Sequence, residues 1–115
     1  MTRIFQQDGV TIVELDERYD SLDDDSIKRL SSALLEVATH SDPPVILLDL
    51  SNTRLIGSRF IGLLVRVWKR IQDRKGRMGL CCVPPFCREA LVTTRLYDTL
   101  WGAYETRDEG IAVLK

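Results

Sequence analysis

The chain has 115 residues, of which 44% are hydrophobic and 29% charged, and its formal net charge at pH 7 is −1. These values describe one ordinary globular domain, spanning residues 1–115, that can bury its own core. The near-neutral charge excludes an overall basic bias, so we expect no direct binding of nucleic acid.

The chain also lacks the signals of membrane and secreted proteins. Its longest apolar runs, such as residues 45–48, fall far short of the roughly 20 residues that span a bilayer, so no membrane insertion is expected. The amino end, MTRIFQQDGV, has no apolar segment followed by a small-residue cleavage site, which predicts a cytoplasmic protein. Three cysteines, two of them adjacent, form no disulfide framework and fit a reducing compartment.

The first predicted element is a β-hairpin. Residues 10–15 (VTIVEL) are β-branched and partly alternating, and they follow the turn signal Asp8-Gly9. The partner strand lies around Ile4-Phe5.

A helix and a buried strand follow the hairpin. Apolar residues recur at spacings of three and four from residue 27 to residue 37, which predicts an amphipathic helix. It starts near Ser21, has aspartates in its first turn and ends before Pro43. Residues 45–50 (VILLDL) predict a central strand that is buried on both faces.

The second half of the chain continues this alternation. It predicts helices at about 58–74, 86–94 and from 108 onward, with strands at 78–83 and 103–105. Strands that alternate with helices indicate an α/β layer with parallel strand pairs.

The helix at 58–74 has two distinct sides. Its apolar arc, which we expect to face the core, contains Phe60, Ile61, Leu63, Leu64, Val65, Val67, Trp68 and Ile71. The other side begins at Ser58 and carries mainly cations. A phosphate on Ser58 would be favoured by free N–H groups, the helix dipole and nearby arginine. The alternative is that Ser58 serves only as the helix cap beside an ordinary solvated face.

The stretch VILLDLSNTRLIGSRFIGLLVRVWKRIQDRKGRMGL resembles a STAS domain of the anti-sigma factor antagonist family. The residues that match the family pattern are Asp49, Ile56, Ser58, Ile61, Gly62 and Gly76. Upstream, Asp20 in LDERYD matches the family's acidic residue, and GIAVL matches its carboxy-terminal helix. The resemblance covers nearly the whole chain.

The resemblance implies a single α/β domain with a small mixed β-sheet covered by about four α-helices. It also implies partner switching in bacterial transcription: the unphosphorylated antagonist binds an anti-sigma factor that is also a serine kinase, and phosphorylation at Ser58 releases it. A serine phosphatase would reset the switch, ATP and magnesium would belong to the kinase, and the chain itself would need no cofactor. A weak homodimer is compatible with this function. The docking surface would comprise Asp20, Gly57, Ser58, Arg59, Gly62 and Arg66.

Three residues depart from the family pattern. Gly57 replaces an aspartate, Arg59 replaces a serine or threonine, and Phe60 replaces a glycine. Phe60 falls in the apolar arc, where a large side chain can pack. The departures at Gly57 and Arg59 suggest one alternative function, a STAS protein that is not switched by phosphorylation and acts as a constitutive antagonist or scaffold. A separate alternative is an accessory STAS subunit of a lipid-transport ABC system.

The cysteines and the histidine do not predict a metal site. The spacing CCxxxxC lacks a CxxC pair, and the one histidine, His40, lies in another predicted helix. Strand alternation predicts that Cys81 and Cys82 face opposite sides of the sheet as small apolar groups, and Cys87 is expected to be an inert thiol rather than an oxidisable one. No catalytic set of residues emerges, so enzymatic activity is not expected.

Overall fold

The structure is a computed structural model of the chain, and it describes residues 3–15, 24–51, 58–85, 87–89 and 102–115. For residues 24–27, 58 and 59 the description is limited to the backbone. The strands are β1 (Arg3–Gln7), β2 (Val10–Glu14), β3 (Val45–Asp49), β4 (Arg77–Cys81) and β5 (Gly102–Tyr104), and the helices are α1 (Asp24–His40), α2 (Ser58–Asp73) and α4 (Arg107–Leu114). Pro85 and residues 87–89 are helical as well, as expected for the predicted helix near residue 86.

The five strands form one mixed sheet in the order β1-β2-β3-β4-β5. β1 is antiparallel to β2, and each later pair of neighbours is parallel. The hairpin between β1 and β2 turns at Asp8 (φ 54°) and Gly9 (φ 81°), the left-handed pair that a tight two-residue hairpin requires. The predicted α/β fold with a small mixed sheet is therefore confirmed.

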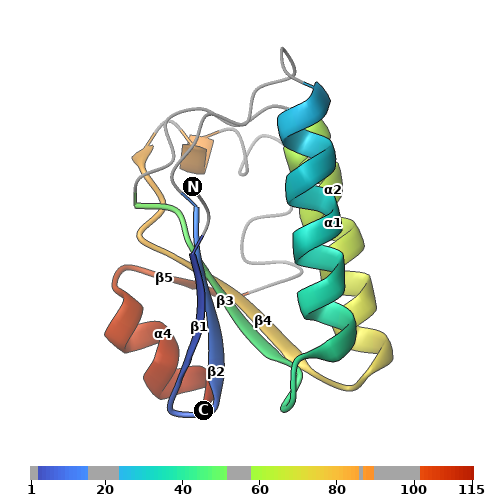
Figure 1. The fold of residues 1–115 in the computed structure, drawn as a ribbon. Coiled ribbons are helices and arrows are strands. Elements are labelled where there is room, and N and C mark those ends of the chain that lie inside the picture. The colour runs from blue at the N-terminus through green and yellow to red at the C-terminus, as the bar shows by residue number, and fades with distance from the viewer. Residues whose placement is uncertain (1–2, 16–23, 52–57, 86, 90–101) are drawn as a thin grey trace.

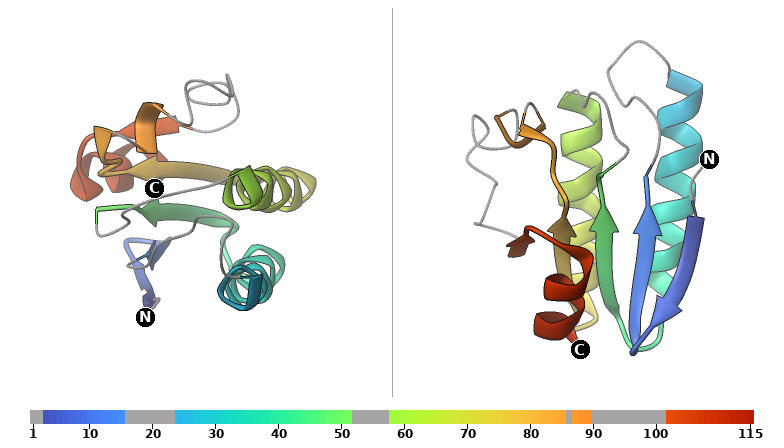
Figure 2. Two further views of the ribbon diagram at one scale, coloured as in Figure 1. Left: turned by 90° about the horizontal axis from the view of Figure 1, so that it is seen from above. Right: turned by 90° about the vertical axis from the view of Figure 1, so that its left-hand side faces the viewer.

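Helices cover both faces of the sheet. α1 links β2 to β3 and α2 links β3 to β4, and right-handed crossovers that add strands in one direction place both helices on the same face. Figures 1 and 2 show α1 and α2 side by side on that face, with α4 on the opposite one. No helix in the described part of the chain has the length and apolar character needed to cross a bilayer.

The core consists of two apolar layers because successive strand side chains point to opposite faces. Ile46 and Leu48 pack in the layer beneath α1 and α2. Leu47, between them in β3, packs with Ile111 and Leu114 of α4. The predicted burial of β3 on both faces is thus confirmed.

The apolar arc predicted for α2 is also confirmed. The buried residues of this helix are Phe60, Ile61, Leu63, Leu64, Val67 and Ile71, and all belong to the predicted set. Val65 and Trp68 are half-buried against the same layer. Phe60 is completely buried, which explains how a large side chain replaces the family's glycine.

The prediction for Cys81 and Cys82 was wrong. The predicted strand at 78–83 ends at Cys81, and Cys82 follows it with a left-handed backbone (φ 58°). Regular alternation stops there, so both cysteines pack in the layer beneath α4.

The last helix starts within one residue of the predicted position. α4 begins at Arg107, because the Thr106 side chain accepts a hydrogen bond from the Glu109 N–H at 3.1 Å and caps the helix.

Candidate functional site

The helix that begins with the predicted phosphosite Ser58, α2, starts at one end of the molecule (Figure 2). The carboxyl ends of β2, β3 and β4 and the first turns of α1 and α2 all lie at this end (Figure 2). Ser58 is the first residue of α2, as predicted, and Arg59 is the second. Asp20 and Gly57 lie outside the described residues, so their predicted roles stay predictions.

The exposed side of α2 begins at this end. Gly62 and Arg66 are exposed and follow Ser58 at intervals of four residues, so the three positions share one face of the helix. A Cβ atom added at Gly62 would meet no atom within 4 Å. A partner can therefore approach the backbone of α2 closely at this position.

Two arginines, one in the last turn of α2 and one directly after it, bind the end of α1. Arg70 Nη1 donates to Thr39 Oγ1 at 2.8 Å, and Arg74 Nη1 donates to the Ala38 carbonyl at 2.9 Å. Cations beside the carboxy-terminal turn of α1 complement the dipole of this helix. The cationic side of α2 therefore divides into a part that joins the two helices and a part, with exposed Arg66, nearer to Ser58.

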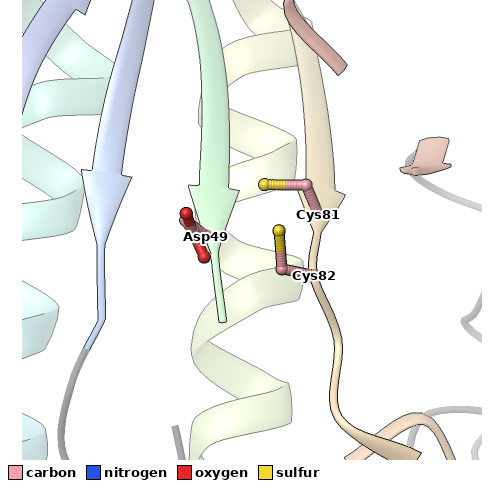
Figure 3. Close-up of side chains that lie close together, drawn as sticks. All are labelled: Asp49, Cys81 and Cys82. Carbon is pink, nitrogen blue, oxygen red and sulfur yellow. The ribbon is translucent and has the colours of Figure 1, made fainter. Parts of the chain in front are cut away.

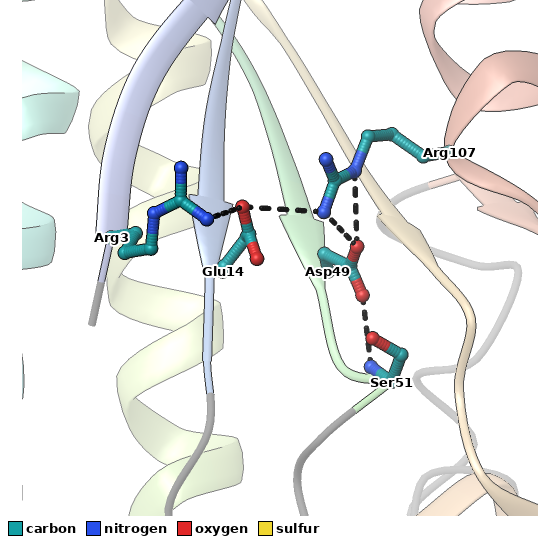
Figure 4. A network of polar contacts seen from close by, with 5 residues as sticks. All are labelled: Arg3, Glu14, Asp49, Ser51 and Arg107. Carbon is teal, nitrogen blue, oxygen red and sulfur yellow. Dashed lines mark hydrogen bonds and ion pairs between the residues drawn. The ribbon is translucent and has the colours of Figure 1, made fainter. Parts of the chain in front are cut away.

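A buried ion pair lies where β3 reaches the same end. Asp49, the last residue of β3, is 4% exposed, and its Oδ2 accepts hydrogen bonds from Arg107 Nη2 at 2.7 Å and Nε at 3.1 Å (Figure 4). Its Oδ1 accepts the Ser51 N–H at 2.9 Å. This charge-assisted geometry joins α4 to the beginning of the segment that leads to Ser58.

The ion pair continues toward the edge of the sheet. Glu14 Oε1 lies 3.4 Å from Arg107 Nη2 and 3.4 Å from Arg3 Nη1 (Figure 4). The guanidinium carbons of both arginines lie over the Phe5 ring, at 5.4 Å for Arg3 and 5.6 Å for Arg107. A row of alternating charges therefore crosses the ends of β1, β2 and β3.

This network changes the acidity of its members. Burial raises the pKa of Asp49, but hydrogen bonds from Ser51 and Arg107 outweigh burial and hold that pKa below its ordinary value. The hydrogen bond to Asp49 raises the pKa of Arg107, against the opposing effect of burial. Both groups are therefore charged at neutral pH.

The thiols of Cys81 and Cys82 lie beside Asp49, with their sulfur atoms and a carboxylate oxygen within 4.8 Å of one another (Figure 3). Burial raises the pKa of both thiols, and the charge of Asp49 raises it further. A metal would need thiolates and a free carboxylate, whereas Arg107 already binds this carboxylate. The trio therefore does not suit a metal cation. Cys87 is buried, and burial raises its pKa, which agrees with the expected inert thiol.

A groove of about 540 Å³ lies elsewhere, between the edge of the sheet and α1. It is lined by Ile4, Phe5, Gln6, Thr11, Ala33, Glu36, Val37, His40 and Ser41. The α1 residues that line the groove lie in the carboxy-terminal half of this helix. The groove is therefore distant from the end of the molecule at which α1 and α2 begin (Figure 1). Gly62 and Arg66, the two predicted docking residues whose side-chain positions the structure describes, do not line the groove.

Sequence reasoning missed the role of Arg107. One signal was present: Glu14 and Asp49 each end an apolar strand with an acidic residue, which suggests two carboxylates at one edge of the sheet. Their arginine partner is 58 residues beyond Asp49 and starts a helix on the other face, so local patterns could not assign it.

The fold defines a small α/β domain with a mixed sheet, and comparison with known proteins gives its family. The family model of the STAS domain matches residues 2–110, and the chain therefore belongs to the STAS domain family. No curated protein matches the chain significantly.

Solved structures with the same fold are described as anti-sigma factor antagonists. An anti-sigma-factor antagonist (STAS) domain protein from Planctomyces limnophilus is 30% identical, with a TM-score of 0.85 over 98% of this chain and 97% of that one. An anti-sigma factor antagonist from Mycobacterium paratuberculosis is 22% identical, with a TM-score of 0.80 over 99% and 92%. The Bacillus cell fate determinant SpoIIAA in its phosphorylated form is 14% identical, with a TM-score of 0.72 over 100% of each chain.

Proposed function

We propose that the protein is an anti-sigma factor antagonist that regulates transcription by partner switching. The unphosphorylated form binds an anti-sigma factor that is also a serine kinase and thereby frees a sigma factor. The kinase transfers a phosphoryl group from ATP to the Ser58 hydroxyl, which releases the complex, and a serine phosphatase removes it. The protein acts in the cytoplasm, by binding and not by catalysis.

The position of Ser58 carries this proposal. It is the first residue of α2, and the exposed positions Gly62 and Arg66 continue its face of the helix. The first N–H groups of a helix lack intrahelical partners, so a phosphate there is favoured by hydrogen bonding and by the helix dipole. The family membership and the description of the Planctomyces limnophilus relative give independent support.

Charge repulsion explains why phosphorylation would release the partner. A phosphoserine adds about −1.5 to −2 charges. α1 begins at the same end of the molecule, and its sequence opens with Asp24 and Asp25 (Figure 1). A pair of like charges 4 Å apart repels by about 4 kcal/mol at an effective dielectric of 20, whereas about 1.4 kcal/mol already changes affinity tenfold.

The residues around Ser58 determine which kinase can act. Gly57 and Arg59 replace an acidic and a small hydroxyl residue of the family pattern, so the local charge is about two units more positive. We expect the kinase to carry an acidic substrate groove that accommodates this change.

The phosphosite is tested by incubating the protein with its serine kinase and ATP and measuring the intact mass. Wild type should gain one phosphate, Ser58→Ala should gain none, and Ser32→Ala, which changes an exposed serine of α1, should behave like wild type. Equal phosphorylation of Ser58→Ala would exclude Ser58 as the phosphosite. Unmodified wild type that still binds the kinase would indicate a constitutive antagonist instead.

A further inference from the structure

Arg107 contacts the last residues of two neighbouring strands. Its Nη2 atom lies 2.7 Å from Asp49 Oδ2 and 3.4 Å from Glu14 Oε1 (Figure 4). Glu14 ends β2, Asp49 ends β3, and the two residues are partners in the parallel register. One side chain from α4 therefore spans the carboxyl ends of both strands.

These strand ends precede the two parts of the proposed docking surface. The segment after β2 contains Asp20, and the segment after β3 leads to Ser58. The distance between the ends of β2 and β3 therefore sets where the two segments toward Asp20 and Ser58 begin.

The chain after β3 is tied to the sheet as far as Ser51. The Leu50 N–H donates to the Cys81 carbonyl at 3.1 Å, as a continuation of the ladder between β3 and β4. The next N–H, that of Ser51, donates to Asp49 Oδ1 at 2.9 Å. This last contact depends on the orientation of the carboxylate, which Arg107 fixes through two hydrogen bonds to Oδ2.

Close packing of α4 fixes Arg107 itself. Ile111 and Leu114 are buried against the sheet, and a Cβ atom added at Gly110 would lie 2.9 Å from both methyl carbons of Leu47. The Thr106 cap sets where the helix begins. Arg107 therefore extends from a rigid element toward the strand ends.

We propose that Arg107 is a positioning residue for partner binding: by bridging Glu14 and Asp49 it holds the ends of β2 and β3 in register, and from these ends the chain continues toward Asp20 and Ser58. This inference rests on the proposed function. According to this proposal, α4 influences the docking surface from the opposite face of the sheet, although none of the predicted docking residues belongs to α4.

The matched control is the arginine that anchors the other end of α4. Arg77 Nη1 donates to the Val113 carbonyl at 3.1 Å and lies at the start of β4, at the opposite end of the sheet from Ser58. Each of the variants Arg107→Gln and Arg77→Gln removes the contacts that one arginine makes at one end of α4. Only the first should affect the docking surface.

The experiment measures two properties of both variants and of wild type. The first is hydrogen exchange of the Ser51 amide by NMR, relative to buried amides of β3. The second is kcat/KM for phosphorylation by a serine kinase shown to modify wild type. Arg107→Gln should speed Ser51 exchange and lower kcat/KM, each by about tenfold, and Arg77→Gln should change neither by more than about twofold.

Each outcome decides the proposal. Unchanged Ser51 exchange in Arg107→Gln, or wild-type phosphorylation despite faster exchange, would overturn it. Equal losses in Arg77→Gln would overturn it as well, because they would indicate general loosening of α4. If no kinase modifies wild type, the proposed function fails at Ser58, while Ser51 exchange still decides whether Arg107 holds the strand end.

Discussion

At the scale of single residues, Asp49 shows how a buried charge is kept in a small domain. Burial alone would favour the neutral acid, yet three hydrogen bonds, two from a guanidinium and one from a backbone N–H, keep the carboxylate ionised. Such a group stabilises the folded state only while it stays charged.

The pH dependence of stability tests this account of Asp49. Because its pKa is lowered in the folded state, its contribution is fully present above about pH 5 and is lost as the pH falls below about 4. Asp49→Asn should be less stable at pH 7 by about 2 kcal/mol and should lose less stability on acidification than wild type. Urea unfolding between pH 7 and pH 3 measures both effects.

Asp73→Asn, which changes an exposed carboxylate of α2, is the control and should follow the wild-type curve. Parallel curves for wild type and Asp49→Asn would contradict a lowered pKa at Asp49.

Phe60 allows a second prediction at this scale. Its side chain is completely buried beneath α2, two residues after Ser58. Phe60→Ala should lower the free energy of unfolding by about 3–5 kcal/mol, because it removes apolar contacts and leaves a cavity. Phe60→Leu, which fills most of the space, should cost about 1 kcal/mol. Urea denaturation distinguishes the two, and a loss below about 1 kcal/mol for Phe60→Ala would show that the ring is not a core side chain.

At the scale of elements, α2 serves the core and the surface with different sides. Its apolar side packs on the sheet, Arg70 and Arg74 join it to α1, and Gly62 and Arg66 remain exposed. A glycine in the middle of an exposed helix face weakens the helix, so its presence there calls for another reason. Close approach of a partner is such a reason.

Gly62→Ala separates stability from binding on this helix. Alanine has a higher helix propensity and its Cβ meets no neighbour, so the variant should gain about 1 kcal/mol in unfolding free energy. If a partner contacts the backbone here, the same methyl group should weaken binding by about tenfold. Thermal unfolding and calorimetric titration with the anti-sigma factor measure the two effects.

Gln72→Ala, at an exposed position in the last turn of α2, is the control and should leave affinity unchanged. Undiminished affinity of Gly62→Ala would exclude Gly62 from the close contact.

At the scale of the whole molecule, local patterns account for most of the architecture. The continuous apolar run of β3, the apolar arc of α2 and the turn signal Asp8-Gly9 each reflect a contact within one element or between adjacent ones. The start of α2 at Ser58 was predictable for the same reason, since serine, a residue type favoured at helix starts, precedes an apolar period.

Features that depend on distant residues were not predictable. The Asp49–Arg107 pair joins residues 58 positions apart through the docking of α4, and no local pattern encodes that docking. The left-handed backbone of Cys82 is another case, because a non-glycine residue gives no sign of positive φ in its sequence. Both features lie at the carboxyl ends of β3 and β4, where the strands end and tertiary contacts replace regular geometry.

The most direct test of the account is the affinity of the anti-sigma factor for three forms of the protein, measured by isothermal titration calorimetry. Unphosphorylated wild type and Ser58→Ala should bind equally tightly, and wild type phosphorylated at Ser58 should bind at least about tenfold more weakly. Equal affinity of the phosphorylated and unphosphorylated forms, or failure of the unphosphorylated form to bind, would contradict partner switching at Ser58.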